Sequence, residues 1–219
     1  MKFKAILLSL TLLVNSSTLA ENHLDFTLSG FCHKSPEAEA QLKDGLYYHP
    51  DQENPYSGEN ICFYTSGQLY YRGELKNGLF HGKMTEWYKN DQIALEVNFV
   101  DGKRKGKWTS WHENGQKENE GNYKEDKEDG KWAEWHENGQ LMHVFDYLDG
   151  EINKWTSWHE NGQLMHVFDY LDGEINKWTS WHENGQKLSE YYYLNGEISK
   201  STYWISDGTI IHYIEQTDY

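Results

Sequence analysis

The chain contains a 23-residue segment that occurs twice in succession without a single change. Residues 135–157 read WHENGQLMHVFDYLDGEINKWTS, and residues 158–180 read the same. Weaker copies flank this pair on both sides, which indicates a chain that grew by adding one small unit. In such arrays each unit packs against its neighbours. The unit therefore determines the architecture, and the function must suit a row of nearly identical surfaces.

One aromatic position marks the register of the units. Its successive occupants are Phe63, Trp87, Trp111, Trp135, Trp158, Trp181 and Trp204, separated by 24, 24, 24, 23, 23 and 23 residues. A Gly or Asp follows four residues after each, and most units close with Asn-Gly or Asp-Gly. These residues suit the positive φ of tight hairpin turns. The unit around Tyr123 differs, because Asp126-Lys127 stands where the turn is expected and Asp129-Gly130 follows.

Two turns in each unit leave two short strands, so every unit is predicted to be a β-hairpin. The strands are rich in Trp, Tyr, Phe, Val and Ile, which favour a pleated, half-buried surface. A helical unit is excluded because Gly and Asn recur in its middle. We therefore predict an all-β protein, an elongated single-layer antiparallel meander of tandem hairpins. Equivalent residues of successive units should lie about 9.6 Å apart, twice the strand spacing.

A single layer has no second layer to bury its apolar side chains, so rows of aromatic rings must pack together on the sheet. The content of 10 Trp and 16 Tyr agrees with this requirement. Core packing is accordingly the simplest interpretation of these rings.

The turn that follows Trp135 decides which side chains share a face. A three-residue Glu-Asn-Gly loop with Gly in a bulge pairs Trp135 with Leu141. The face that carries Trp135 would then also carry Leu141, His143, Phe145 and Tyr147. A two-residue Asn-Gly turn moves Trp135 to the opposite face, and we favour the first alternative. In either case Trp132 and Trp135, three residues apart on one strand, point to opposite faces.

The first twenty residues have the layout of a secretory signal peptide. Lys2 and Lys4 precede an apolar run over residues 5–14, and Ala20 ends a small polar stretch. No second apolar run of membrane length follows, so we expect an exported chain, periplasmic or secreted, without a transmembrane segment. Without residues 1–20 the chain has 18 basic and 35 acidic residues, a net charge of 18 − 35 = −17.

This charge argues against nucleic acid and anionic lipid as partners, because both are bound through Lys and Arg. A cationic protein face or a cation-bearing glycan fits better. The charge could equally serve only to keep a flat sheet from pairing with its copies.

Residues 21–43 differ in composition and are predicted to form a capping segment before a repeat array over residues 44–216. Ser35 as N-cap, Pro36 at the first position and acidic residues in the first turn predict a short helix over residues 35–42. It would cover the open edge of the first hairpin. Cys32 and Cys62, the two cysteines of the chain, could form a disulfide in an oxidising compartment. Free or intermolecular cysteines are the alternative.

No catalytic, cofactor or metal site is predicted. The recurring histidines of the turns lie about 9.6 Å apart in the expected sheet and cannot share a zinc ion whose ligands lie about 2 Å from it. They are His112, His136, His159 and His182. The carboxylates match no catalytic motif, and no nucleophile elbow or P-loop occurs. We therefore expect that the protein is not an enzyme.

The unit GKWTSWHENGQK, followed by a Tyr and a DG or NG turn, resembles the MORN repeat variant. The order of units is similar to that of the YwqK family of bacterial antitoxin components, and residues 45–58 with GELKNGLFHGKMTEWYKND resemble the opening of those chains. The resemblance covers about residues 44–216. The resemblance to MORN repeats implies contacts with proteins and, in some members, association with membranes or lipids. The antitoxin label implies that the protein binds and neutralises a toxin. The resemblance brings no catalytic residues.

Three functions remain open from the sequence. The first is a non-catalytic exported scaffold that binds a protein partner, such as a YwqK-like antitoxin or immunity-type binder. The second is a cell-envelope glycan-binding module whose platforms would be Trp108, Trp132, Trp155 and Trp178. Exposed indoles at these positions would favour the glycan, and buried ones would remove its platforms. The third is a spacer.

Overall fold

A computed structural model describes residues 40–50 and 52–215 of the chain. All regular elements within these residues are strands. Their bounds are β1 (Gln41–Lys43), β2 (Leu46–Tyr48), β3 (Gly58–Phe63), β4 (Leu69–Lys76), β5 (Leu79–Trp87), β6 (Ile93–Val100), β7 (Lys103–Trp111), β8 (Lys117–Lys124), β9 (Lys127–Trp135), β10 (Leu141–Leu148), β11 (Glu151–Trp158), β12 (Leu164–Leu171), β13 (Glu174–Trp181), β14 (Lys187–Leu194), β15 (Glu197–Trp204) and β16 (Ile210–Glu215).

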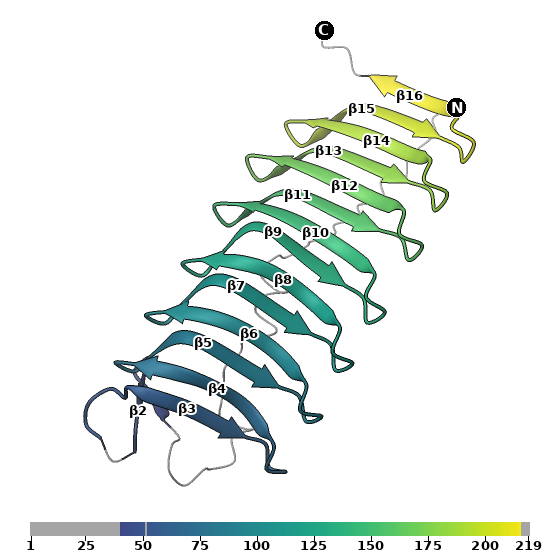
Figure 1. Cartoon of the computed structure of the whole chain (residues 1–219). Helices are drawn as coiled ribbons and strands as arrows, with labels where there is room; N and C mark the ends of the chain where they lie inside the picture. The colour runs from purple at the N-terminus through teal and green to yellow at the C-terminus, as the bar shows by residue number, and fades with distance from the viewer. Residues whose placement is uncertain (1–39, 51, 216–219) are drawn as a thin grey trace.

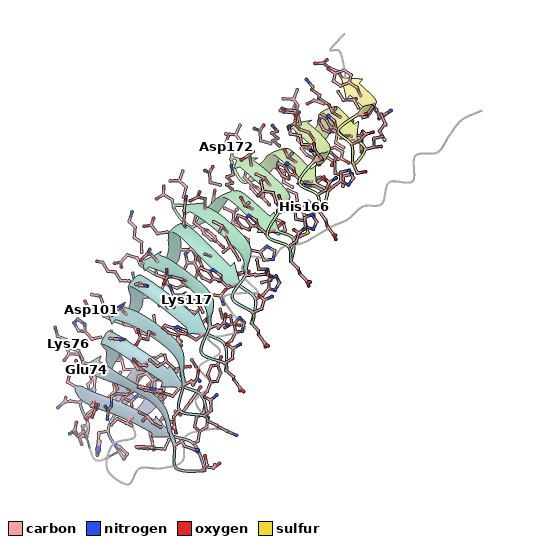
Figure 2. All side chains as sticks on the ribbon, turned by 45° about the vertical axis from the view of Figure 1, so that its right-hand side comes forward. Glu74, Lys76, Asp101, Lys117, His166 and Asp172 are labelled. Atoms are coloured by element: carbon pink, nitrogen blue, oxygen red, sulfur yellow. The ribbon has the colours of Figure 1, made fainter. Side chains whose placement is uncertain are left out.

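Strands β3–β16 form one 14-stranded antiparallel sheet in which every strand pairs with its neighbours in the chain. The sheet is a single elongated layer (Figure 1). Side chains project from both of its sides (Figure 2). Within the described residues only the N-terminal end is covered by a further element, the short β1–β2 sheet. The predicted all-β meander of tandem hairpins is confirmed.

The turns alternate between the two long margins of the sheet. At one margin, which we call the DG margin, the first turn residue has a φ near +50° and is followed by a Gly at positive φ, as at Asp149 (+53°) and Gly150 (+87°). Among the turns of this margin that the structure describes, only the one in the unit around Tyr123 lacks the Gly. There Glu125 (+52°) and Asp126 (+66°) form the turn, one residue earlier than predicted.

At the other margin, which we call the ENG margin, each turn is followed by a one-residue bulge. Trp135 pairs with Leu141, as predicted, but the next pair is Glu134 with His143, so Met142 is an extra residue. Phe145 consequently pairs with Trp132 and lies on its face. The prediction that His143, Phe145 and Tyr147 share a face with Trp135 is therefore wrong, because the bulge shifts the alternation by one residue.

The difference between 24-residue and 23-residue units is also a bulge. In the shorter units one extra residue, such as Asn153, lies opposite the pair Asp146 and Tyr147. In the longer units the strand that follows the DG-margin turn carries two extra residues at the equivalent position. These strands are β5, β7 and β9, and one glycine of each has a positive φ. Gly82, Gly106 and Gly130 have φ values of +81°, +83° and +69°. The additional residue is thus absorbed within the strand, and the pairing order is unchanged.

One face of the sheet carries the core, and we call it the ring face. Its central row runs across the strands as Met84, Val97, Trp108, Trp132, Phe145, Trp155, Phe168, Trp178 and Tyr191. Ring centroids lie 4.8 Å apart for Trp155–Phe168 and 5.3 Å apart for Trp108–Trp132. These contacts replace the burial that a second layer normally provides.

The N-terminal end differs from the expected cap. Strands β1 and β2 form a separate two-stranded sheet, so the continuous sheet begins at Gly58 and not at residue 44. Tyr47 is buried beside Leu75 and donates its backbone N–H to Gly78 O at 2.9 Å. Residues 35–39 of the predicted helix lie outside the described residues, whereas Gln41 and Leu42 belong to β1. The helix therefore does not reach these two residues.

Cys62 is buried on β3 and is disulfide-bonded. Its predicted partner, Cys32, lies outside the described residues, as does the predicted signal peptide, so both stay predictions. Among the described residues no helix has the length and apolar character needed to span a membrane.

Candidate protein-binding surface

The four tryptophans predicted as glycan platforms all lie on the ring face. Trp108 and Trp132 are only 6% and 9% exposed. Trp155 and Trp178 are half-buried, and each ring is stacked between two others. Trp155 lies between Phe145 and Phe168 with interplanar angles of 6° and 9°, and Trp178 lies between Phe168 and Tyr191 at 11° and 18°. Their ring faces are already covered by neighbouring rings, so none of the four offers a free platform for a sugar.

A second row of tryptophans lies on the opposite face of the sheet. It consists of Trp87, Trp111, Trp135, Trp158, Trp181 and Trp204, and every member is partly buried, as Trp155 and Trp178 are. Each is three residues beyond a ring-face position on the same strand, which places it on the other side. Sequence reasoning used this row only to find the register and did not recognise it as a surface. The alternation of the strand places this row opposite the ring face, once it is known which face is buried.

Lysine–glutamate pairs accompany this row in the flanking units. Lys117 Nζ lies 2.7 Å from Glu120 Oε2, and Lys187 Nζ lies 2.9 Å from Glu190 Oε2. Burial alone would raise the pKa of Glu190, but the hydrogen bonds from Lys177 and Lys187 lower it to about 2. The two lysines also lie over indoles of the next unit, Lys117 5.7 Å from the ring centroid of Trp135 and Lys187 5.3 Å from that of Trp204.

The duplicated units replace both charged residues by apolar ones. Leu141 and Val144 stand where the preceding unit has Lys117 and Glu120, and Leu164 and Val167 repeat the change. Register places these side chains on the tryptophan side, since Leu141 pairs with Trp135, Leu164 with Trp158, and both valines with Thr156. We define the apolar patch as Trp135, Leu141, Val144, Trp158, Leu164 and Val167. All six are partly buried, and each keeps part of its surface exposed.

The ENG turns beside the tryptophans are tied to one another. His112 Nε2 lies 2.9 Å from Trp135 O, and Asn114 Nδ2 donates to Glu137 O at 2.7 Å. The same two bonds recur from His159 and from His182 with their following asparagines. Within the described residues His136 makes no such bond, and Asn138 Nδ2 instead donates to Gln140 Oε1. The recurring histidines thus act in turn-to-turn hydrogen bonding, with one interruption beside the apolar patch.

Ionisable groups also lie within the ring face. Burial raises the pKa of Glu86 and of Glu134 to about 7, with a further contribution from Glu118 at Glu134. His143, which pairs with Glu134, has a lowered pKa chiefly because it is buried, and its Nδ1 accepts a hydrogen bond from Trp155 Nε1 at 3.2 Å. In the described part of the chain no three His, Cys, Asp or Glu side chains are grouped so that they could hold a metal.

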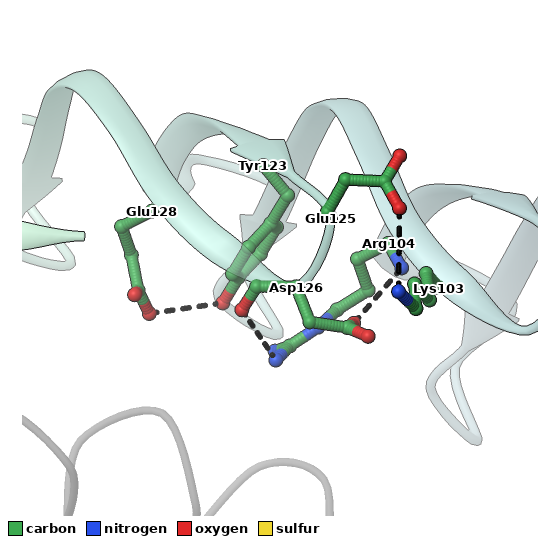
Figure 3. A network of polar contacts seen from close by, with 6 residues as sticks. All are labelled: Lys103, Arg104, Tyr123, Glu125, Asp126 and Glu128. Carbon is green, nitrogen blue, oxygen red and sulfur yellow. Dashed lines mark hydrogen bonds and ion pairs between the residues drawn. The ribbon is translucent and has the colours of Figure 1, made fainter. Parts of the chain in front are cut away.

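Polar contacts at the DG margin support the turns. Arg104 Nε lies 3.0 Å from Asp126 Oδ1, its guanidinium lies 4.0 Å from the ring centroid of Tyr123, and Lys103 pairs with Glu125 at 3.4 Å (Figure 3). This network holds the one turn of the DG margin, among the described residues, that lacks an Asn-Gly or Asp-Gly pair. Farther along the same margin, where Asp172 lies (Figure 2), Leu171, Tyr193 and Leu194 help to line a shallow hollow of about 360 Å³.

Comparison with known proteins identifies the repeat. Four segments match the family described as the MORN repeat variant, at residues 80–101, 104–125, 128–149 and 176–195. These four segments are MORN-type repeats, and the predicted resemblance to the MORN repeat variant is confirmed for them. No curated protein matches the chain.

Similarity to solved structures is distant. One is a TarM variant from S. aureus in complex with fondaparinux, alpha-GlcNAc-glycerol and UDP, at 10% identity and a TM-score of 0.25; the match covers 53% of this chain and 19% of that one. Another is a protein of unknown function from Bacteroides fragilis, at 11% identity and a TM-score of 0.12, covering 73% of this chain and 93% of that one. This chain thus spans about a fifth of the length of TarM.

Proposed function

We propose that this chain of MORN-type repeats is a non-catalytic scaffold that binds a protein partner through a face of its sheet. The observation that carries the proposal is the row of partly exposed tryptophans along one side of a single-layer sheet. Monomeric proteins rarely leave contiguous apolar surface uncovered unless it is used for binding. Hydrogen bonds between successive ENG turns hold much of this row in a fixed arrangement, which lowers the cost of ordering it on binding.

The proposal extends to an exported binder of the antitoxin or immunity type, located in the periplasm or secreted. Support comes from the signal-like residues 1–20 and from the similarity in the order of units to the YwqK family. Such a protein would act by covering a surface of its partner, and no residue of its own would need to react. The net charge of −15 favours a partner with a basic face.

Affinity capture tests the proposal. The full chain, tagged at its C-terminus, is crosslinked in its native cells, and an unrelated all-β protein of similar net charge serves as the control bait. A protein recovered stoichiometrically with the chain and absent from the control is the expected result. Recovery of no specific protein after crosslinking in every compartment would contradict the proposal. Growth rescue on co-expression of the chain with its captured partner would identify that partner as a toxin.

A further inference from the structure

The apolar patch occupies only the duplicated part of the array. Charged pairs bound it on both sides, Lys117–Glu120 on β8 and Lys187–Glu190 on β14. Four strands, β9–β12, contribute its six side chains, so its length along the array is about 15–20 Å at a strand spacing of about 4.8 Å. Residues two apart on a strand lie about 7 Å apart, which gives the width of its two rows.

Acidic side chains border the patch on one side. Glu137, Glu160 and Glu183 lie in successive ENG turns, next to the tryptophan row, and are exposed. None of the ion pairs among residues 40–50 and 52–215 includes them. Equivalent residues of successive units repeat every ~9.6 Å. The surface is thus an apolar stripe with unneutralised negative charges along one border.

We propose that the apolar patch binds a basic amphipathic α-helix of a partner protein, which lies along the array with its apolar stripe on the patch. This inference rests on the proposed function and names the surface and the class of partner. Lys or Arg residues along one flank of the helix would face Glu137, Glu160 and Glu183.

The dimensions favour a helix over an extended segment. A helix with its side chains is about 10 Å wide and covers both rows of the patch, whereas an extended strand would contact one row. Three to four helical turns match the length of the patch at ~5.4 Å per turn. Helix residues seven apart repeat about every 10.5 Å on one face, close to the unit spacing of about 9.6 Å.

Charge argues against a second copy of this chain as the occupant. Each copy carries a net charge of −15, and the glutamates bordering the patch would approach those of the other copy. Like charges brought together across an interface disfavour association. A basic helix instead gains from the same glutamates.

The chain itself supplies a matched variant. A four-residue variant introduces the lysine–glutamate pairs that the flanking units already carry at these positions. Its substitutions are Leu141→Lys, Val144→Glu, Leu164→Lys and Val167→Glu. The net charge is unchanged, and the fold should persist because β8 and β14 accommodate the same residues. The reverse variant, Lys117→Leu with Glu120→Val, extends the patch by one unit.

The probe is an 18-residue Leu/Lys amphipathic helical peptide, with a scrambled peptide of equal composition as control. Kd is measured by calorimetry at about 0.15 M salt, where exposed charges are screened beyond ~8 Å. The four-residue variant is expected to bind the peptide at least about tenfold more weakly than the natural chain, because apolar area is lost. The reverse variant should bind more tightly, and the scrambled peptide should bind no form well.

Several results would overturn the inference: equal affinity of the natural chain and the four-residue variant, absence of peptide binding, or a dimer of the natural chain in sedimentation that the variant abolishes. Preferential binding of soluble cell-wall glycan fragments by the natural chain would also overturn it. Affinity capture with the four-residue variant separates this inference from the proposed function. If that variant still recovers the same partner, the chain binds proteins through another surface.

Discussion

At the scale of single residues, the two copies of the duplicated unit show how an identical residue can have opposite effects. Ser157 and Ser180 occupy the same position, and both are buried. Ser180 Oγ lies 2.6 Å from Ser189 Oγ, whereas Ser157 Oγ has no hydrogen-bond partner because the strands beside it carry His143 and His166. The neighbouring strand, and not the unit itself, decides whether the hydroxyl is satisfied.

Replacing these serines by alanine should therefore change stability in opposite directions. Ser157→Ala removes an unsatisfied buried hydroxyl and should raise the free energy of unfolding by about 1 kcal/mol. Ser180→Ala leaves Ser189 without its partner and should lower it by about 1 kcal/mol. Urea denaturation of the two variants measures both changes. A change of the same sign in both variants would contradict the proposed role of the hydrogen bond between Ser180 and Ser189.

Glu134 should make stability dependent on pH. Its pKa in the folded state is about 7, above the ordinary 4.5, because it is buried. The folded state thus binds the proton more tightly than the unfolded state. The resulting stabilisation is complete below pH ~4.5 and is lost as the pH rises through ~7.

Glu134→Gln should accordingly raise the free energy of unfolding by about 1–3 kcal/mol at pH 8 and have little effect at pH 4.5. Glu137→Gln removes the same charge from an exposed turn and is the control. Thermal unfolding at both pH values compares the two variants. An equal gain at pH 8 in both would attribute the effect to net charge and not to burial.

At the scale of the hairpin, turn chemistry and period were sufficient to predict strands, their order and the Trp135–Leu141 pairing. The face of Phe145 was not predictable in the same way, because the extra residue Met142 looks like any other strand residue. The burial of the individual tryptophans could not be predicted in this way either. Alternation places Trp132 and Trp135 on opposite sides but does not say which side is buried. Burial depends on the neighbouring strand. There Trp132 is paired with the large ring of Phe145, whereas Trp135 is paired with the smaller Leu141.

Gly121 shows the same dependence on neighbours. It lies between Trp108 and Trp132 in the ring row, and its lack of a side chain allows the two indoles to meet 5.3 Å apart. A Cβ at this position would collide with the indole of Trp132.

Gly121→Ala should therefore lower the free energy of unfolding by about 1–3 kcal/mol and change the near-ultraviolet circular dichroism of the indoles. Gly162→Ala provides the comparison, because its φ is +80° and no atom lies within 4 Å of the added Cβ. It should cost about 1 kcal/mol through backbone strain and leave the indole signal unchanged. An unaltered indole signal in Gly121→Ala would show that the ring row tolerates a side chain there.

At the scale of the whole molecule, the sheet is a one-dimensional array in which each strand contacts its two neighbours. Stability should then be close to a sum over units and the contacts between them. Removing one entire unit preserves the alternation of strand direction, whereas removing one strand reverses it for everything that follows. The two kinds of deletion should therefore have very different effects.

Deletion of residues 158–180 should leave a folded sheet that is two strands shorter. Trp155 would take the place of Trp178 against Tyr191, and Ser157 would take the place of Ser180 opposite Ser189, which supplies the hydrogen bond that Ser157 now lacks. Cooperative unfolding with a denaturant m-value reduced by roughly a tenth, in proportion to chain length, is expected. Deletion of residues 159–171, strand β12 with the turn that precedes it, is the control and should not yield a cooperatively folded protein. Loss of cooperative unfolding in the full-unit deletion would mean that distant units support one another, since nearest-neighbour contacts would then be insufficient to hold the array.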